Sequence, residues 1–286
     1  MGRPRRRAEG RLRRAAGAGD GPHEGGTATR RILKPATLSA VAASVLWVLH
    51  DAGLFEPGRA SRWWQNLQVR LGELQPAWDA ALVRELLSAC AETVQMAWAG
   101  TILGALLALP LAMLAARPLA PAWLAAPTRL LLVAVRTVPA ILWALLLLAL
   151  VGLGGPAGIL GLAIYTTGFL GKLLYEAFEG IDAETLDAAR STGASRWAVA
   201  RAFVLPEMGN TIVSKTVYAF EYNVRASSIL GLVGAGGIGT YLLLYIERYQ
   251  FDRLATALIM LFALVAAVEG AGSLVRRHFI DARSAH

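Results

Sequence analysis

The chain has a single cysteine and four histidines in 286 residues. One cysteine, Cys90, cannot form a disulfide within the chain and supplies too few ligands for a cysteine-based zinc site. The histidines are scattered, and no two of them form a ligand pair at helical spacing: His23, His50, His278 and His286. We therefore expect no metal ion and no other cofactor.

A phosphate-binding loop of the GxxxxGK[ST] type is also lacking, because Lys172 is followed by Leu173 and has no correctly spaced glycine. Residues 234–239 do fit the pattern GxGxxG. That pattern marks a dinucleotide site only between a strand and a helix of an alternating strand–helix sequence, and here long apolar segments surround it. We expect that the chain binds no dinucleotide, does not hydrolyse ATP by itself and is not an enzyme.

Hydrophobic residues make up 56% of the chain, too many for an ordinary soluble domain and enough for several membrane spans. The net charge of +8 comes largely from arginines in the first 34 residues. A tail rich in arginine and glycine, without aromatic residues, is expected to be disordered and to lie near anionic lipid headgroups. We predict a membrane protein that does not bind nucleic acid.

A bilayer core about 30 Å thick requires about 20 mostly apolar residues per helix. Six segments reach or approach that length: residues 33–50, 93–116, 130–151, 158–175, 212–232 and 254–274. Glu221 and Arg225 interrupt the fifth, and Pro110 and Pro139 within other spans allow kinks. The sequence predicts an all-α polytopic bundle with about six transmembrane helices.

Sidedness follows from the lysines and arginines in short flanking segments, since these are retained on the cytoplasmic side. With six spans, the basic N-terminal tail shares a side with Arg117, Arg129, residues 172–201 and the C-terminal arginines. The opposite side receives residues 152–157, which carry no charge. Both termini are therefore expected in the cytoplasm, with the chain in the cytoplasmic (inner) membrane of a bacterium.

Between the first two spans, residues 59–87 carry a stripe of apolar residues at helical spacing, with tryptophans suited to a membrane interface. The stripe consists of Trp63, Leu67, Leu71, Leu74 and Trp78. A helix along the outer surface and simple packing on the bundle both explain it.

A polar island between two apolar segments predicts two short helices. Asp182 is placed to cap a first helix over residues 184–192, and Gly193 ends it because glycine readily adopts left-handed backbone. Ser195 is placed to cap a second helix over residues 196–204, which Pro206 closes. Small residues leave a flat surface for another protein, and larger residues next to them supply anchors. The anchors are Arg190, Arg196, Trp197 and Arg201.

This island resembles the EAA motif of the membrane subunits of ABC-type importers: Glu-Ala-Ala, three residues, Gly, nine residues, Ile, any residue, Leu-Pro. Here Asp187 replaces the glutamate and Phe203 the isoleucine, while Gly193, Leu205 and Pro206 match. The resemblance implies a cytoplasmic loop gripped by a separate ATP-hydrolysing subunit. The expected contact residues are Asp187, Ala188, Ala189, Gly193, Ala194, Arg196, Leu205 and Pro206.

A longer stretch, from Phe220-Glu221-Tyr222-Asn223-Val224-Arg225 through the glycines that follow, looks like the phosphonate importer permeases. The glycines of this segment are Gly231, Gly234, Gly236, Gly237 and Gly239. Shorter matches elsewhere are Glu92-Thr93, Arg136-Thr137-Val138-Pro139, Tyr165-Thr166-Thr167-Gly168 and Arg277-His278-Phe279. The resemblance covers residues 87–279 and implies a type I ABC importer permease fold. It also implies a homodimer, two copies of an ATP-binding subunit and an extracytoplasmic phosphonate-binding protein.

The expected organisation is a disordered basic cytoplasmic tail, residues 1–32, and a first transmembrane helix, residues 33–50. An extracytoplasmic segment with an interfacial helix, residues 51–87, leads to the importer transmembrane domain, residues 88–279. Its cytoplasmic coupling loop covers residues 177–210, and residues 280–286 form a cytoplasmic tail.

Charges inside the membrane are costly and need a compensating environment. Glu221 and Arg225 are spaced so that they can pair on one helix face. Arg225, helped by Asn223 and Tyr222, is able to offer a positive site to a passing phosphonate; a purely structural pair is the alternative. Arg136 either extends to the cytoplasmic interface or lines the inner mouth of the path.

The sequence leaves open other solutes and two other classes of function. The solute is phosphonate or, alternatively, phosphite, phosphate or methionine, because related permeases share the EAA loop. A membrane-embedded enzyme would need clustered catalytic residues, and the chain offers an isolated Glu and Arg. An ion-coupled carrier would need inverted internal repeats, and none is apparent.

Overall fold

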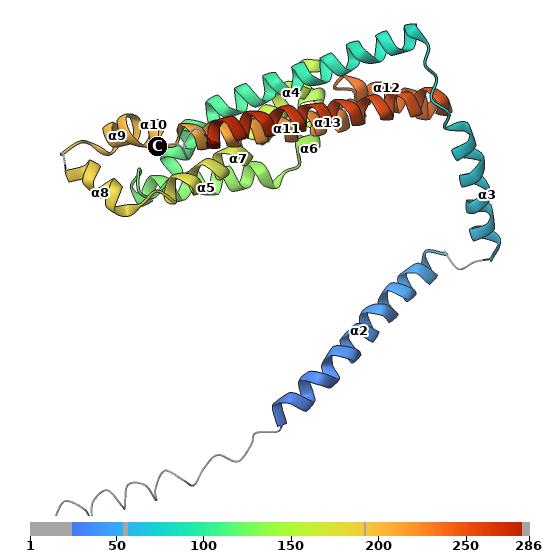
Figure 1. Ribbon diagram of the computed structural model, residues 1–286, viewed down its shortest axis with the longest axis horizontal. Helices are drawn as coiled ribbons and strands as arrows, with labels where there is room; N and C mark the ends of the chain where they lie inside the picture. Colours follow the sequence, from blue (N-terminus) through green and yellow to red (C-terminus); the bar gives the residue numbers. More distant parts are fainter. Residues whose placement is uncertain (1–24, 54–56, 192, 282–286) are drawn as a thin grey trace, which may run out of the picture. The chain divides into compact units, whose positions relative to one another are not determined.

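The computed structural model describes residues 25–53, 57–191 and 193–281, and within these ranges the regular elements are helices, without a strand (Figure 1). The chain divides into two compact units, Met1–Val69 and Arg70–His286. The predicted basic tail falls mostly on residues 1–24, outside the described residues.

The first unit contains helix α2, Gly25–Asp51, and most of α3, Pro57–Glu73. Helix α2 begins before the predicted start at residue 33 and includes the apolar stretch Thr37–Asp51. Helix α3 confirms a helix that carries Trp63, Leu67 and Leu71.

The predicted stripe of residues 59–87 is wrong beyond α3. Leu74 and Trp78 lie in the non-helical segment that separates α3 from α4. Pro76 explains the break, because a proline disfavours helical backbone at the residue before it and offers no N–H to the preceding turn.

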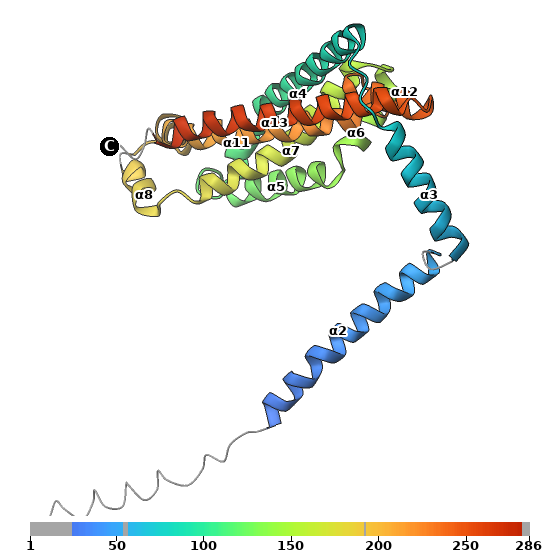
Figure 2. The same cartoon turned by 45° about the vertical axis from the view of Figure 1, so that its right-hand side comes forward.

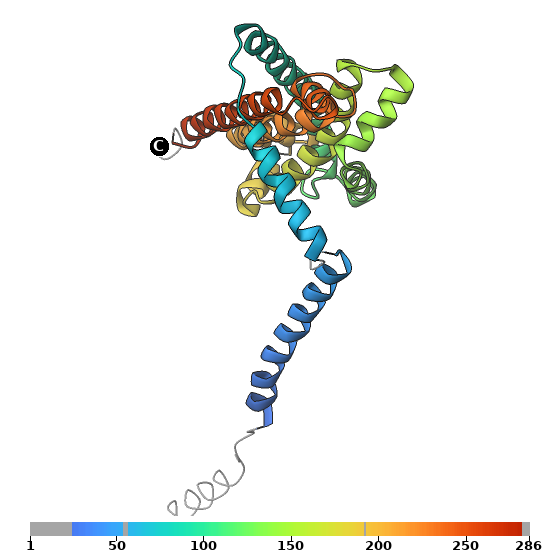
Figure 3. The same cartoon turned by 90° about the vertical axis from the view of Figure 1, so that its right-hand side faces the viewer.

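The second unit is a helical bundle. Its elements are α4 Ala80–Ala115, α5 Ala122–Thr137, α6 Ala140–Val151, α7 Gly155–Glu179, α8 Ala183–Ser191, α9 Arg196–Val199, a π-helical turn Ala200–Val204, α10 Leu205–Glu207, α11 Gly209–Gly231, α12 Ile238–Glu247 and α13 Phe251–Asp281. Helix α7 packs against α4, α5, α6 and α11, while α13 packs against α11 and α12. Seen along the bundle, red α13 and green α5 and α6 lie on opposite sides (Figure 3).

Three described helices are long and apolar enough to cross a membrane: Ala80–Ala115, Gly155–Glu179 and Phe251–Arg277. The predicted third span, residues 130–151, is not one helix: α5 and α6 meet at 83°. Pro139 has no N–H for the helical ladder, and it holds Val138 in extended backbone (φ −83°, ψ 120°). The bent pair raises the number of possible spans to four.

The other predicted spans differ in their bounds or character. Helix α4 begins at Ala80 instead of residue 93. Helix α11 covers the predicted fifth span but is too polar to qualify as an apolar span, since it contains Lys215, Glu221 and Arg225. The short apolar helix α12 was not expected from the sequence.

The glycine-rich segment is a tight connection between α11 and α12. Three of its glycines adopt left-handed backbone: Gly234 (φ 91°), Gly236 (φ 100°) and Gly237 (φ 70°). A Cβ on Gly231 would lie 2.6 Å from the Gly239 Cα and 2.6 Å from the Gly236 carbonyl oxygen. The turn follows a helix, so the strand that a dinucleotide site requires is not there. These glycines serve close backbone packing.

A hydroxyl of α4 holds this turn. The backbone N–H of Ile238 donates to the Thr93 hydroxyl over 2.9 Å, and Thr93 is fully buried. Two separate parts of the family resemblance, Glu92-Thr93 and the glycine segment, therefore pack directly against each other where α4 meets the start of α12.

Helix α11 is linked to three neighbours by polar groups. The Asn223 side-chain amide donates to the hydroxyls of Thr101 on α4 and Thr166 on α7, each over 2.8 Å. On α13, Arg276 pairs with Glu221, and Glu269 pairs with Arg225. The buried Glu221 carboxylate and the buried Asn223 amide nitrogen thereby gain partners on other helices, while the Asn223 Oδ1 atom has none in the described part of the chain.

The expected pair between Glu221 and Arg225 is therefore wrong. Glu269 and Arg276 stand two turns apart on α13, each opposite a charge of the other sign on α11. Gly272 lies between them, and its missing side chain leaves room for the Glu221 carboxylate. Such cross-helix pairs neutralise all four charges, whereas a pair within α11 would leave those of α13 unpaired.

We predict that replacing Gly231 with Ala destabilises the bundle by about 1–3 kcal/mol, because the added methyl group would overlap the backbone of Gly236 and Gly239. The thermal midpoint of the purified protein in detergent measures the effect. Gly270→Ala is the matched control, since a Cβ there meets nothing within 4 Å. Equal midpoints for the two variants would contradict the packing role.

We predict that Arg276→Met lowers the free energy of unfolding by about 3 kcal/mol, because Glu221, only 5% exposed, would keep a buried charge without its partner. Adding Glu221→Gln to that variant removes the charge and restores part of the loss. Unfolding in detergent by titration with SDS, followed by circular dichroism, measures both. A double variant no more stable than Arg276→Met would refute the ion pair.

Candidate functional site

The polar island forms a helical hairpin of α8 and of α9 to α10, which we call the coupling hairpin (residues 183–207). It lies at one end of the bundle, near the C-terminal end of α13, while α12 lies at the other end (Figures 1 and 2). The turn between α4 and α5 is at the hairpin end, because the Arg190 side chain donates to the Pro118 carbonyl over 2.5 Å.

The backbone conformation and capping of the hairpin agree with the sequence-based predictions at two positions. Gly193 has left-handed backbone (φ 77°), as a helix-ending glycine should. The Ser195 hydroxyl accepts from the Ala198 N–H over 3.2 Å and caps α9. Asp182 differs from expectation: its carboxylate accepts from the Thr185 hydroxyl over 3.0 Å. The Asp182 backbone carbonyl, in turn, accepts the first helical bond, from Leu186.

The second helix of the hairpin does not close at Pro206. After α9 it widens into the π-helical turn, in which the Leu205 N–H donates to the Ala200 carbonyl. The next helical turn then starts at Leu205, and Pro206 occupies a first-turn position where no N–H is needed. The helical path therefore continues through Pro206 to Met208, where α11 follows.

Buried side chains fix the coupling hairpin to the bundle. Leu186 of α8 and Val199 and Val204 of the second helix belong to one apolar cluster with Phe178 and Leu174 of α7. At the same end, Glu179 accepts from the Arg117 backbone N–H over 3.1 Å and pairs with Arg129. Since both helices of the hairpin share this core with α7, the hairpin is part of the folded bundle.

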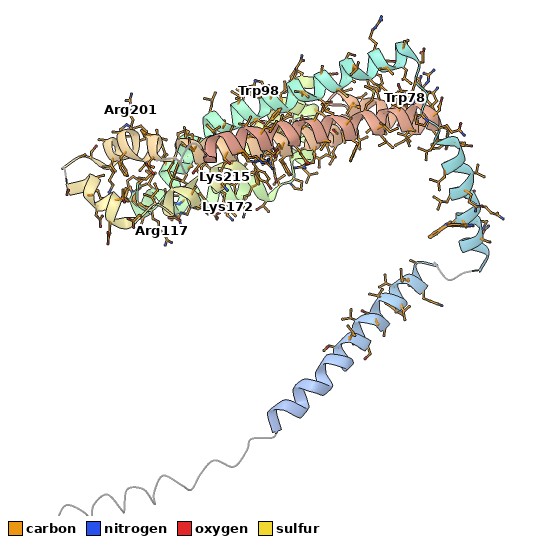
Figure 4. The ribbon with its side chains drawn as sticks, in the orientation of Figure 1. Trp78, Trp98, Arg117, Lys172, Arg201 and Lys215 are labelled. Atoms are coloured by element: carbon orange, nitrogen blue, oxygen red, sulfur yellow. The ribbon has the colours of Figure 1, made fainter. Side chains whose placement is uncertain are left out.

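The opposite face of the hairpin is open. Of the eight residues predicted to contact a partner, six are exposed: Asp187, Ala188, Gly193, Ala194, Arg196 and Pro206. Ala189 and Leu205 are half-buried against the apolar cluster. Trp197 and Arg201, two of the expected anchors, are exposed, and Figure 4 labels Arg201 at this end. The open face carries small side chains, and large side chains flank them. This arrangement suits close docking of another protein.

The four predicted path residues do not form one cluster. Glu221 and Asn223 are buried between helices of this chain, while Arg225 is exposed beside Glu269. Arg136 lies on α5, half-buried, with its Nε atom buried and without a hydrogen-bond partner in the described part of the chain.

Residues that the sequence reading missed complete this region. Thr101, Thr166 and Glu269 are the partners of Asn223 and Arg225. Glu269 carried a signal, since it is the only charged residue in the last apolar segment, residues 254–274. Thr166 lies in the family match Tyr165-Thr166-Thr167-Gly168, although that match does not connect it with Asn223, and Thr101 carried no signal.

Residues 100–280 match the family described as binding-protein-dependent transport system inner membrane component. The phosphate-import permease protein PhnE of Mycolicibacterium smegmatis is 36% identical over 247 residues, which are 85% of this chain and 44% of that protein. The chain thus spans less than half the length of this relative. The phosphite transport system permease protein PtxC of Stutzerimonas stutzeri is 34% identical, over 75% of this chain and 78% of the relative.

Among solved structures, the inward-facing MetNI methionine ABC transporter has a chain of similar fold, with a TM-score of 0.64 and 24% identity. The match covers 70% of this chain and 99% of that one. An amino acid ABC transporter gives a TM-score of 0.57 at 17% identity, over 71% and 99% of the two chains. This chain belongs to the family of binding-protein-dependent transport system inner membrane components, with the fold of a type I ABC transporter permease.

Proposed function

We propose that the chain is the permease subunit of an ATP-driven ABC importer that carries phosphonate or a related small phosphorus oxyanion across the cytoplasmic membrane. The observation that carries this proposal is the identity of 36% and 34% with permeases named for phosphate and phosphite. A relative named for methionine transport is 32% identical over 44% of this chain, a shorter match. The alternative solutes within the class are phosphite, phosphate and methionine.

The proposed energy source is a separate ATP-binding subunit that docks on the coupling hairpin. Support comes from the exposed small residues of the hairpin and from their anchoring through Leu186 and Val199 to the core of the bundle. Two copies of this subunit, a second copy of the chain and an extracytoplasmic solute-binding protein would complete the transporter.

We further propose that the hairpin end faces the cytoplasm, together with both termini. Arg117 and Arg201 lie at this end, with Arg276 and Arg277 near the end of α13 (Figure 4). Basic residues next to membrane helices are retained inside the cell, which supports this orientation. Trp78 lies at the other end, where a tryptophan suits the outer interface.

Among the proposed path residues, Arg225 is the best candidate for contact with the solute, because it is the one on α11 that is open to the surface. Glu221 and Asn223 would act behind it, by holding α11 against α13, α4 and α7. Arg136 remains a candidate for the inner mouth, since its Nε atom is buried without a partner among the described residues.

Replacing Gly193 with Val tests the coupling role. Valine resists left-handed backbone, so the hairpin would rearrange at a cost of about 1–2 kcal/mol, and affinity for the ATP-binding subunit should fall about tenfold. Titration of the purified permease with its ATP-binding subunit measures this affinity. Gly209→Ala is the control, because Gly209 lies in α11 and a Cβ there meets nothing within 4 Å. Unchanged affinity for Gly193→Val would argue against docking at the hairpin.

The substrate class is tested by uptake into proteoliposomes that contain the permease and its ATP-binding subunit, with the cognate solute-binding protein outside. We expect ATP-dependent accumulation of radiolabelled methylphosphonate, phosphite or phosphate, and no accumulation of methionine. Methionine uptake without phosphorus oxyanion uptake would replace this assignment with the alternative.

A further inference from the structure

In its second half, helix α11 has its fully exposed residues on one narrow stripe. Between Ala219 and Gly231, Arg225 and Ile229 are the exposed residues, and Tyr222 is half-buried. Together with exposed Tyr218, these residues follow the spacing of one helix face, i, i+4, i+7 and i+11. The rest of this part of α11 is covered by neighbouring helices or half-covered.

Helix α7 extends this surface with aromatic rings. Tyr165 and Phe169 stack against Tyr222 with centroids 5.4 and 5.3 Å away, and Phe169 lies 6.0 Å from Tyr218. The Tyr222 hydroxyl donates to the Tyr165 hydroxyl over 3.2 Å. The two helices therefore present one continuous surface with phenol groups at its middle.

Two lysines continue the surface towards the coupling hairpin. Lys172 follows Phe169 by one turn on α7, and Lys215 precedes Tyr218 by one turn on α11. The helices run in opposite directions, so the lysines lie at the same level of the bundle, as Figure 4 shows. Arg225 is about 15 Å from Lys215 along α11, or ten residues. Positive charges thus stand at both ends of the aromatic surface.

Contact with lipid acyl chains would be energetically unfavourable for this surface. The Arg225 and Glu269 side chains are 44% and 47% exposed, although both belong to the membrane-spanning part of the bundle. Each charge left in hydrocarbon costs about 2.5–3.5 kcal/mol on insertion scales. By contrast, the exposed residues of α4 between positions 102 and 107 are all apolar: Ile102, Leu103, Leu106 and Leu107.

The chemistry of the surface fits a hydrated anion. Cationic nitrogens and phenol hydroxyls are hydrogen-bond donors for phosphoryl oxygens. Arg225 is paired with Glu269, and Lys172 is paired with Glu176 over 3.0 Å. An acid beside each of these cations competes with a bound oxyanion, so the anion is held weakly and can move on.

We propose that this surface is one wall of the aqueous path for a phosphorus oxyanion, with Arg225 as its first cationic contact and the lysines as its last. The wall consists of Tyr218, Tyr222, Arg225 and Ile229 of α11, Tyr165, Phe169 and Lys172 of α7, and Lys215 at the start of α11. The inference rests on the proposed function. It adds the residues that the anion meets and assigns the aromatic surface to water rather than to lipid or to a second copy of the chain.

Single cysteines test the water exposure of this wall. Cys90→Ala first removes the one native thiol, which is buried. Ile229→Cys on the wall and Leu107→Cys on the apolar face of α4 are then matched, since the native residues are 52% and 56% exposed. An anionic, membrane-impermeant methanethiosulfonate is applied to the transporter in proteoliposomes, complete with its ATP-binding subunit, with and without ATP.

We expect the thiol at position 229 to react about tenfold faster or more in at least one of the two states. The thiolate attacks the sulfenyl sulfur of the reagent, forms a mixed disulfide and displaces methanesulfinate, and a thiolate forms in water and not in hydrocarbon. Equal rates at the two positions, or no reaction at position 229 in either state, would overturn the proposal and place lipid or a second copy on this surface. The readout does not depend on which solute is transported.

A transport measurement then tests the anion itself. Lys215→Met should reduce the maximal rate of methylphosphonate or phosphate uptake severalfold with little change in KM, because the solute-binding protein sets the apparent affinity. Lys215→Arg keeps the charge and should retain uptake. Equal uptake in both variants would remove the anion from the wall. Absence of uptake by the unmodified transporter would instead refute the proposed function, whatever the thiol result.

Discussion

A polar group in a membrane helix needs a partner on a neighbouring helix, and this requirement organises the bundle around α11. Asn223 reaches α4 and α7 through two hydroxyls, while Glu221 and Arg225 reach α13. For the buried Asn223 and Glu221, no water replaces a lost partner, so their contacts fix both the register and the rotation of α11 against its neighbours. A helix too polar to qualify as an apolar span is thereby bonded through its polar side chains to three neighbouring helices, α4, α7 and α13.

Features governed by the local backbone were predictable from the sequence. Gly193 ends a helix and Ser195 caps the next because each depends on one residue and its immediate neighbours. The bend at Pro139 belongs to the same class, because a proline allows a kink, although the uninterrupted apolar run around it predicts one span instead of two helices at 83°. Likewise, the positions of the glycines were clear, although the α4 hydroxyl of Thr93 that receives their turn was not.

Features that depend on which helices meet were not predictable. Glu221 and Arg225 are suitably spaced for a pair, and the sequence holds no information on what lies opposite them; α13 supplied better partners. The helix past Pro206 was missed for a related reason, since a π-helical turn is chosen by the packing of Val199 and Val204 into the core. In a chain with many apolar residues, the hydrophobic pattern is nearly uniform around each helix. The pattern therefore does not indicate which helix faces meet, and side-chain packing decides it.

The coupling hairpin is connected to the polar residues of α11 by a short length of backbone. From Arg196 to Gly231 the backbone is almost continuously helical, and its one widened turn, Ala200–Val204, is held in the core of the bundle. A displacement of the hairpin would therefore act directly on the start of α11. Because α11 is tied to α13 by two ion pairs and to α4 and α7 by Asn223, the helices have to shift together or exchange partners. The half-exposed Arg225–Glu269 pair is the contact best placed to exchange, since water is able to replace either partner there, whereas buried Glu221 has no such substitute.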